Sequence, residues 1–196
     1  EEYVREVLQE ASDILDNALP ADMYKNCVHN IDNIKLIGGV SWWAQIYKGV
    51  GRKRKDYDIK VNYQLLEAVP EENQKKCLLT TLCHELIHTV DGCFNHGEKF
   101  KHCAKMIREY TNNYICVTWK KPLADWGGDV EDVKSFKYIV TCKKCGAKWG
   151  YISKPKSYGN EREFECNECG GDIIVKKKSW IMTYIISDIH GEYDLF

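Results

Sequence analysis

Apolar residues near the N-terminus recur at intervals of three and four positions, the spacing of a helix that buries one face. The pattern stops before Pro20, which cannot continue a helix. Its members are Val4, Val7, Leu8, Ala11, Ile14, Leu15, Ala18 and Leu19. We expect this first helix to support the fold rather than to carry chemistry.

Two runs of β-branched and aromatic residues, 41–48 and 57–63, favour strands. The polar loop between them, residues 49–55, contains glycine and therefore predicts a hairpin. We interpret its basic tip either as a solvated turn or as a contact for nucleic acid.

A second helix is predicted to begin at Pro70, with Glu71 and Glu72 at the positive end of its dipole, and to end near Gly92. Its apolar stripe indicates a core helix and consists of Leu78, Leu79, Leu82, Cys83, Leu86, Ile87 and Val90. A third helix is expected over residues 97–112, with a similar stripe of Phe100, Cys103, Ala104, Ile107 and Tyr110.

The composition sets limits on size and location. A chain of 196 residues can hold one medium domain and one small module. No stretch approaches the roughly 18 consecutive apolar residues of a membrane span, and the acidic N-terminal helix is unlike a signal peptide. We therefore expect a cytoplasmic protein with no membrane partner. The charges of the 28 basic and 29 acidic residues nearly cancel. Only the distribution of charge along the chain can therefore indicate a charged partner.

Ten cysteines could form disulfides in a secreted protein, but four of them form two Cys-x-x-Cys pairs, which in a reducing compartment indicate a metal site. The other six show no such pairing, and we interpret them mostly as small buried apolar residues. They are Cys27, Cys77, Cys83, Cys93, Cys103 and Cys116.

The second predicted helix carries a His-Glu-x-x-His motif. Histidines four residues apart project from one helix face, so His84 and His88 can both bind one Zn²⁺. Glu85 lies beside them and can accept a proton from a water molecule that the zinc activates. This combination predicts hydrolysis of amide bonds. The alternative is that both histidines are merely hydrogen-bonded surface or core residues.

The third ligand is less directly given by the spacing. Position 94 is Phe94 where a metzincin would have histidine, so the chain is not a metzincin. Glu109 on the next helix could serve as a carboxylate ligand, but His96 requires a shorter return of the chain, and we favour His96. We do not expect His29 or His102 to be ligands.

Three segments in this order, 58–66, 82–88 and 95–100, resemble the SprT-like (Spartan-related) zinc metallopeptidases. The last segment is similar to the family's His-Gly-x-x-Phe/Trp motif, whose histidine is the third zinc ligand. Lys99 departs from the family, which often has glutamate there, and we expect the change to be harmless. The resemblance implies a zincin-like helical catalytic domain with a small β-hairpin or sheet, acting on proteins bound or crosslinked to DNA.

A second metal site is predicted nearer the C-terminus. Cys142 and Cys145 are separated by twenty residues from Cys166 and Cys169, and each pair is followed by glycine. Two such pairs wrap one tetrahedral zinc, and four thiolates close its coordination sphere. We therefore predict a structural zinc ribbon rather than two redox pairs, which gives the protein one catalytic and one structural Zn²⁺.

Residues 133–178 contain eleven Lys or Arg against five Asp or Glu, and aromatic residues are interleaved with them. This pattern suits single-stranded nucleic acid, because lysines contact phosphates and aromatics stack on bases. The resemblance to SprT-like proteins favours this interpretation and implies DNA as the partner. The candidate contacts are Lys143, Lys144, Lys148, Trp149 and Tyr151. The alternative is that the aromatics form the ribbon's core and the lysines solvate it.

The sequence thus predicts an α+β protein: a metallopeptidase domain at 1–128, with a linker near Gly127, a zinc ribbon at 134–178 and a tail at 179–196. The alternatives are a non-catalytic zinc protein that binds nucleic acid and a general intracellular peptidase that needs none. Residues 182–191 resemble the start of calcineurin-like metallophosphoesterases, but Asp188 and His190 cannot assemble a two-metal site, and we assign them no activity.

Overall fold

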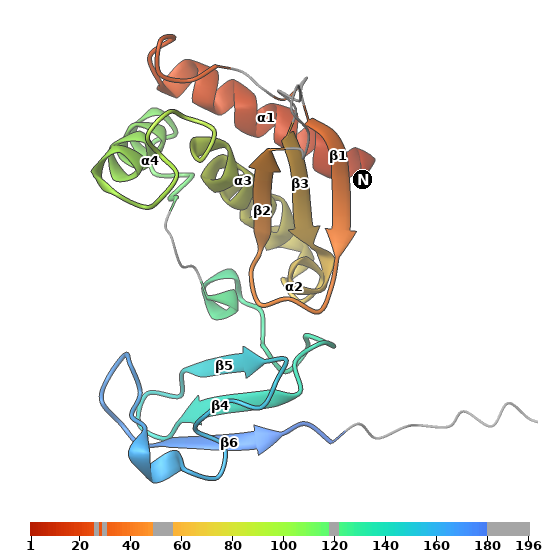
Figure 1. Cartoon of the computed structure of the whole chain (residues 1–196), viewed down its shortest axis with the longest axis vertical. Helices are drawn as coiled ribbons and strands as arrows, with labels where there is room; N and C mark the ends of the chain where they lie inside the picture. The colour runs from red at the N-terminus through yellow and green to blue at the C-terminus, as the bar shows by residue number, and fades with distance from the viewer. Residues whose placement is uncertain (26–27, 29–30, 49–56, 118–121, 180–196) are drawn as a thin grey trace, which may run out of the picture.

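The computed structural model describes residues 1–25, 28, 31–48, 57–117 and 122–179 (Figure 1). The basic loop at 49–55, Cys27, His29 and the segment 182–191 lie outside this part. The α+β class is confirmed, since helices and a small sheet come first and a second small sheet follows. Among the described residues, every helix is too short or too polar to cross a bilayer.

The N-terminal part packs three long helices and a three-stranded sheet around one apolar core (Figure 1). Helix α3 lies between α1 and the sheet, and almost every residue of its second half is buried. It is therefore a central helix rather than one with a single apolar stripe. The elements are α1 (Glu2–Ala18), β1 (Ile31–Ile37), β2 (Ala44–Lys48), β3 (Tyr57–Asn62), α2 (Tyr63–Glu67), α3 (Glu71–Ile87) and α4 (Glu98–Tyr110).

The predicted hairpin is present, because β2 and β3 pair in antiparallel register with Ile46 opposite Ile59. The sheet also has a strand that the sequence analysis did not anticipate. Strand β1 pairs in parallel with β3, so the strand order is β1-β3-β2 and β2 lies at an edge. Asn33 and Lys35 dilute the apolar character of β1, and its parallel partner lies beyond a long connection.

Helix α3 ends earlier than predicted, at Ile87 rather than near Gly92. The backbone N–H groups of His88, Thr89 and Val90 each bond to a carbonyl three residues back, which tightens the last turn. Gly92 then reverses the chain at a φ of 81°. The early end leaves a loop free to return toward the helix before α4 begins.

The C-terminal part is a three-stranded antiparallel sheet of order β5-β4-β6. Its strands are β4 (Tyr138–Cys142), β5 (Lys148–Tyr151) and β6 (Ile173–Lys177), accompanied by the 3₁₀ turns η2 (Leu123–Trp126) and η3 (Glu161–Glu163). One face of the sheet forms a small core that includes Val140, Cys142, Cys166 and Ile173.

A second apolar cluster joins the two parts, and we name it the junction core. It consists of Leu65, Val69, Cys77, Leu123, Trp126, Val133, Phe136 and Ile139. The segment around Gly127, expected to be a linker, is packed: a Cβ at Gly128 would lie 2.4 Å from the Ala68 carbonyl oxygen. The segment therefore packs against its neighbours, and both the linker and the domain limits stay a prediction.

Candidate active site and second metal centre

Three histidines meet beside the end of α3. His84 and His88 project from the helix one turn apart, and the loop that follows brings back His96. The Nε2 atom of His84 lies 3.3 Å from Nε2 of His88 and 3.0 Å from Nε2 of His96. Two nitrogens bound tetrahedrally to one zinc are separated by about 3.3 Å, given bonds of about 2.0–2.1 Å. The donor set and its spacing therefore fit a zinc ion.

Neighbouring groups hold these imidazoles in place. The Nδ1 atom of His88 lies 2.7 Å from the carbonyl oxygen of Cys93, so Nδ1–H donates to that oxygen and Nε2 keeps its lone pair for a metal. The buried ring of Phe100 contacts all three imidazoles, with ring centroids 4.7–5.0 Å apart. Burial, together with the charge of His88, lowers the pKa of His96, which favours the neutral ligand form.

Glu85 is buried between α3 and the edge strand, with 8% of its surface exposed. Its Oε2 accepts a hydrogen bond of 2.9 Å from the backbone N–H of Ile46 on β2. Burial raises the pKa of Glu85 to about 7, and the Ile46 N–H partly opposes that rise. A cation held by the neighbouring histidines would also favour the carboxylate. This contact links residues 39 positions apart and has no signal in the sequence.

A hollow of about 620 Å³ opens over this site between β2 and the loop after α3. Its wall includes His84, Glu85, His88 and His96, and also Trp42, Gln45, Ile46, Tyr47, Tyr57, Thr89, Asp91 and Phe94. Phe94 is 82% exposed, which is unusual for so large an apolar side chain. The volume of the hollow falls within the range of about 300–1,000 Å³ that ligand pockets occupy.

The structure brings together the three histidines that the sequence analysis selected. Their ligand atoms all lie within 4.8 Å of one another. Glu109, the alternative third ligand, does not join this group; it lies on α4 and pairs with Lys105 at 3.7 Å. His102 is exposed on α4 and is also not part of the group.

Four cysteine sulfurs converge in the C-terminal part. The Sγ atoms of Cys142 and Cys169 are 3.6 Å apart, and so are those of Cys145 and Cys166. These distances fit thiolates bound to one zinc at about 2.3 Å. Backbone N–H groups, first that of Cys145 and then that of Lys144, lower the pKa of Cys142 to about 6, which favours its thiolate. Four of the other cysteines, Cys77, Cys83, Cys93 and Cys103, are buried, as predicted.

The residues expected to contact DNA differ in how far they are exposed and in whether their charges are already paired. Lys148 donates to Asp129 at 2.8 Å and to Glu131 at 2.7 Å, so its charge is already matched. Trp149 is half-buried and packs against the ribbon's core. Lys143, Lys144 and Tyr151 are exposed.

A model of the SprT-like family matches residues 5–121, which is more than half of the chain. No curated protein and no solved structure matched the chain.

Proposed function

We propose that this chain, which belongs to the SprT-like family, is a zinc endopeptidase of the His-Glu-x-x-His type that cleaves proteins bound to DNA. Members of the family are generally zinc metallopeptidases. The observation that carries the proposal is the position of Glu85, whose carboxylate is held by Ile46 beside three converging imidazoles.

His84, His88 and His96 would hold the zinc as neutral ligands, and the Cys93 carbonyl and the Phe100 ring fix their orientation. Zinc, when bound, polarises a carbonyl and lowers the pKa of water toward about 7. Three protein ligands would leave zinc able to bind a water molecule or a substrate carbonyl, and the hollow lies beside the three histidines.

Glu85 acts as the general base. Its Oε2 is anchored to the Ile46 N–H, so its other oxygen, Oε1, accepts the proton of the attacking water. The same carboxyl group then returns that proton to the amine nitrogen as the peptide bond breaks. Burial of Glu85 raises the pKa of its carboxyl group above the ordinary value, which makes it a stronger base than an exposed glutamate.

The support for DNA comes from the ribbon. Tyr151 lies directly opposite Tyr138, and Tyr138 lies directly opposite Lys177 on the next strand, so the three form one row across the sheet. Tyr158 packs on Tyr138, and Lys154 lies 5.0 Å from the centre of the Tyr158 ring. Aromatic rings beside lysines are suited to stacking on bases and to contacting phosphates.

The first test compares the wild type with Glu85→Gln, which keeps the shape and can still accept from the Ile46 N–H. Both proteins should bind zinc equally. Cleavage of a DNA-binding protein should fall by about 10²–10⁴-fold in the variant, the usual contribution of a general base. Equal cleavage by the two proteins would exclude Glu85 as the base.

The second test addresses DNA. Cleavage should increase when single-stranded DNA is added, and the double variant Lys143→Ala/Lys144→Ala should bind DNA less tightly, with a shallower dependence on salt. Lys25→Ala, which removes an exposed lysine from the N-terminal part, is the matched control. Cleavage that is indifferent to DNA would instead support a general peptidase.

A further inference from the structure

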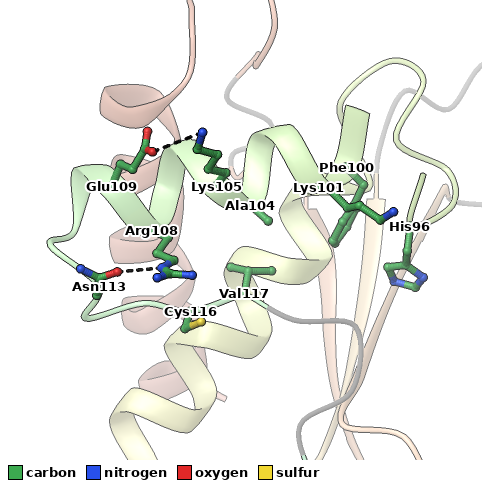
Figure 2. A pocket seen from close by; sticks show the side chains of 10 residues that line it. All are labelled: His96, Phe100, Lys101, Ala104, Lys105, Arg108, Glu109, Asn113, Cys116 and Val117. Atoms are coloured by element: carbon green, nitrogen blue, oxygen red, sulfur yellow. Dashed lines mark hydrogen bonds and ion pairs between the residues drawn. The ribbon is translucent and has the colours of Figure 1, made fainter. Parts of the chain in front are cut away.

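A second hollow, the α4 groove, starts at His96 and follows α4 (Figure 2). Its volume is about 580 Å³. The floor is apolar, because Phe100, Ala104 and Val117 are each less than one-tenth exposed and belong to the core of the N-terminal part. Core residues hold the floor in shape when the groove is empty.

Three cations line the groove along one helix. Lys101, Lys105 and Arg108 follow one another at intervals of four and three residues, so they lie along one side of α4. Figure 2 shows Lys101 at the end near His96 and Arg108 at the end near Asn113. Among the described residues of the lining, Glu109 is the one carboxylate. With His96 neutral, the groove therefore carries a net positive charge.

The two lysines are paired only at the surface. Lys101 lies 2.7 Å from Glu98 and Lys105 lies 3.7 Å from Glu109, and all four side chains are more than half exposed. Ion pairs exposed to this degree contribute little to stability and are weakened by salt. An anion that enters the groove can therefore replace either carboxylate.

Arg108 is held in place by a neutral group. Its Nε atom donates to the side-chain oxygen of Asn113 at 2.7 Å (Figure 2). Asn113 has a φ of 65° in the turn after α4, a conformation that asparagine tolerates better than most residues. The contact fixes the guanidinium through Nε without neutralising its charge. The two Nη groups remain suited to a two-point contact with a phosphate.

The neighbouring active-site hollow has the opposite charge. Apart from the histidines, its charged side chains among the described residues are Glu85 and Asp91. A zinc ion at the histidines would offset these two carboxylates, but it would not provide a row of cations. A polyanion therefore fits the α4 groove better than the hollow, and the two meet at His96.

The length of the cationic row fits a nucleic-acid strand. Lys101 and Arg108 are seven residues apart, which is about 10 Å along the helix axis. A strand with the rise of B-DNA, about 3.4 Å per nucleotide, carries about three phosphates over this length. The apolar floor suits the flat face of an unpaired base, so the groove fits a single strand.

We propose that the α4 groove binds the backbone of a single nucleic-acid strand through Lys101, Lys105 and Arg108. The proposal rests on the proposed function and adds to it a DNA contact on the peptidase part of the chain, separate from the ribbon. A strand in the groove passes beside His96, so a protein attached to that strand is held next to the three histidines.

The test measures binding of a fluorescent single-stranded oligothymidine to the full zinc-loaded chain by fluorescence anisotropy. The double variant Lys105→Gln/Arg108→Gln removes two cations from exposed positions. Its affinity should fall at least about tenfold at about 50 mM salt. The slope of log affinity against log salt should become shallower by about 1.4, because each phosphate contact to a single strand contributes about 0.7.

Asn113→Asp tests the role of Arg108 without removing it. The aspartate can still accept from Nε, but it places a negative charge beside the guanidinium. Affinity for the oligothymidine should therefore fall at least about threefold at low salt, although the fold is unchanged. Bound oligothymidine should also slow alkylation of the Cys116 thiol, measured by mass spectrometry, because Cys116 lines the groove.

The matched control is Arg5→Gln/Lys35→Gln, which removes the same charges from exposed residues outside the groove. Its affinity should stay within about twofold of the wild type, because salt screens charges that touch no phosphate. An acidic peptide of glutamates should displace the oligothymidine less well than an unlabelled oligothymidine of equal charge. Equal displacement would identify the groove as a site for acidic peptides and overturn the proposal.

The proposal is also overturned if Lys105→Gln/Arg108→Gln binds with the affinity and salt slope of the wild type, if Asn113→Asp has no effect, or if Cys116 is not protected. The proposed function then still stands, provided that the wild type binds the oligothymidine through the ribbon. Failure of the peptidase function has a different signature, because the oligothymidine would bind as expected while wild type and Glu85→Gln cleave equally or not at all.

Discussion

Adding one methyl group at Gly150 tests how the two parts of the chain are joined. Gly150 lies on β5 opposite Ile139, and the Phe136 ring of the junction core covers it. A Cβ at this position would lie 1.9, 2.3 and 2.5 Å from three carbons of that ring. Phe136 is only 4% exposed, so the ring cannot move aside without disturbing its neighbours.

The expected cost of Gly150→Ala follows from this clash. Overpacking a core usually costs about 1–3 kcal/mol, and removing a buried phenylalanine altogether costs about 3–5 kcal/mol. Because the added Cβ would clash with three atoms of the Phe136 ring, we expect the free energy of unfolding to fall by about 2–3 kcal/mol. At Gly38, an added Cβ meets only the flexible end of Gln64, so Gly38→Ala should cost less than about 1 kcal/mol.

The assay is denaturant unfolding of the zinc-loaded protein, combined with a double-mutant cycle. Phe136→Leu shortens the side chain that is hit, so Gly150→Ala should cost at least about 1 kcal/mol less in that background. If DNA stimulates cleavage as proposed, that stimulation should fall in Gly150→Ala while cleavage without DNA persists, because the histidines lie outside the junction core. A coupling energy near zero would refute the contact between Gly150 and Phe136.

Three further predictions concern the metal centres and one ion-pair cluster. His96→Ala should weaken zinc binding at the histidines by at least about 100-fold in chelator competition, whereas His102→Ala should leave it unchanged. Cys166→Ser should reduce bound zinc from two ions to one and unfold the ribbon in NMR spectra; a well-dispersed ribbon would contradict this. Lys148→Met should cost about 0.5–1 kcal/mol at pH 7, because its ion pairs are partly exposed. Lys148 lowers the pKa of Asp129 below its ordinary value of 3.8, so this cost should be present at neutral pH and fade in urea titrations below about pH 4.

The two clusters of candidate metal ligands were predictable because their signals are local. Two histidines one helical turn apart must share a face, and two cysteines separated by two residues must lie in one turn. His96 could be predicted as the third ligand because only a short loop separates it from α3. Local spacing therefore located both donor sets without knowledge of the rest of the fold.

The contacts that were missed join distant segments. The bond from Ile46 to Glu85 and the parallel pairing of β1 depend on how strands pack against α3. Lys148 looked available for phosphate because its partner Asp129 lies in a turn that the sequence marked only as a linker. Charge and hydropathy show which residues suit a surface, but only tertiary packing shows which of them are already paired.

The junction core also bears on how this protein can be divided for experiments. A chain cut at residue 128 would lose Val133, Phe136 and Ile139 and expose the apolar surface that they cover on Leu65, Val69 and Cys77. Uncovered apolar surface of this kind promotes aggregation. Low activity in a shortened chain would therefore report poor solubility as readily as loss of the proposed DNA binding. Point substitutions on the ribbon are the sounder way to separate its role from that of the histidines.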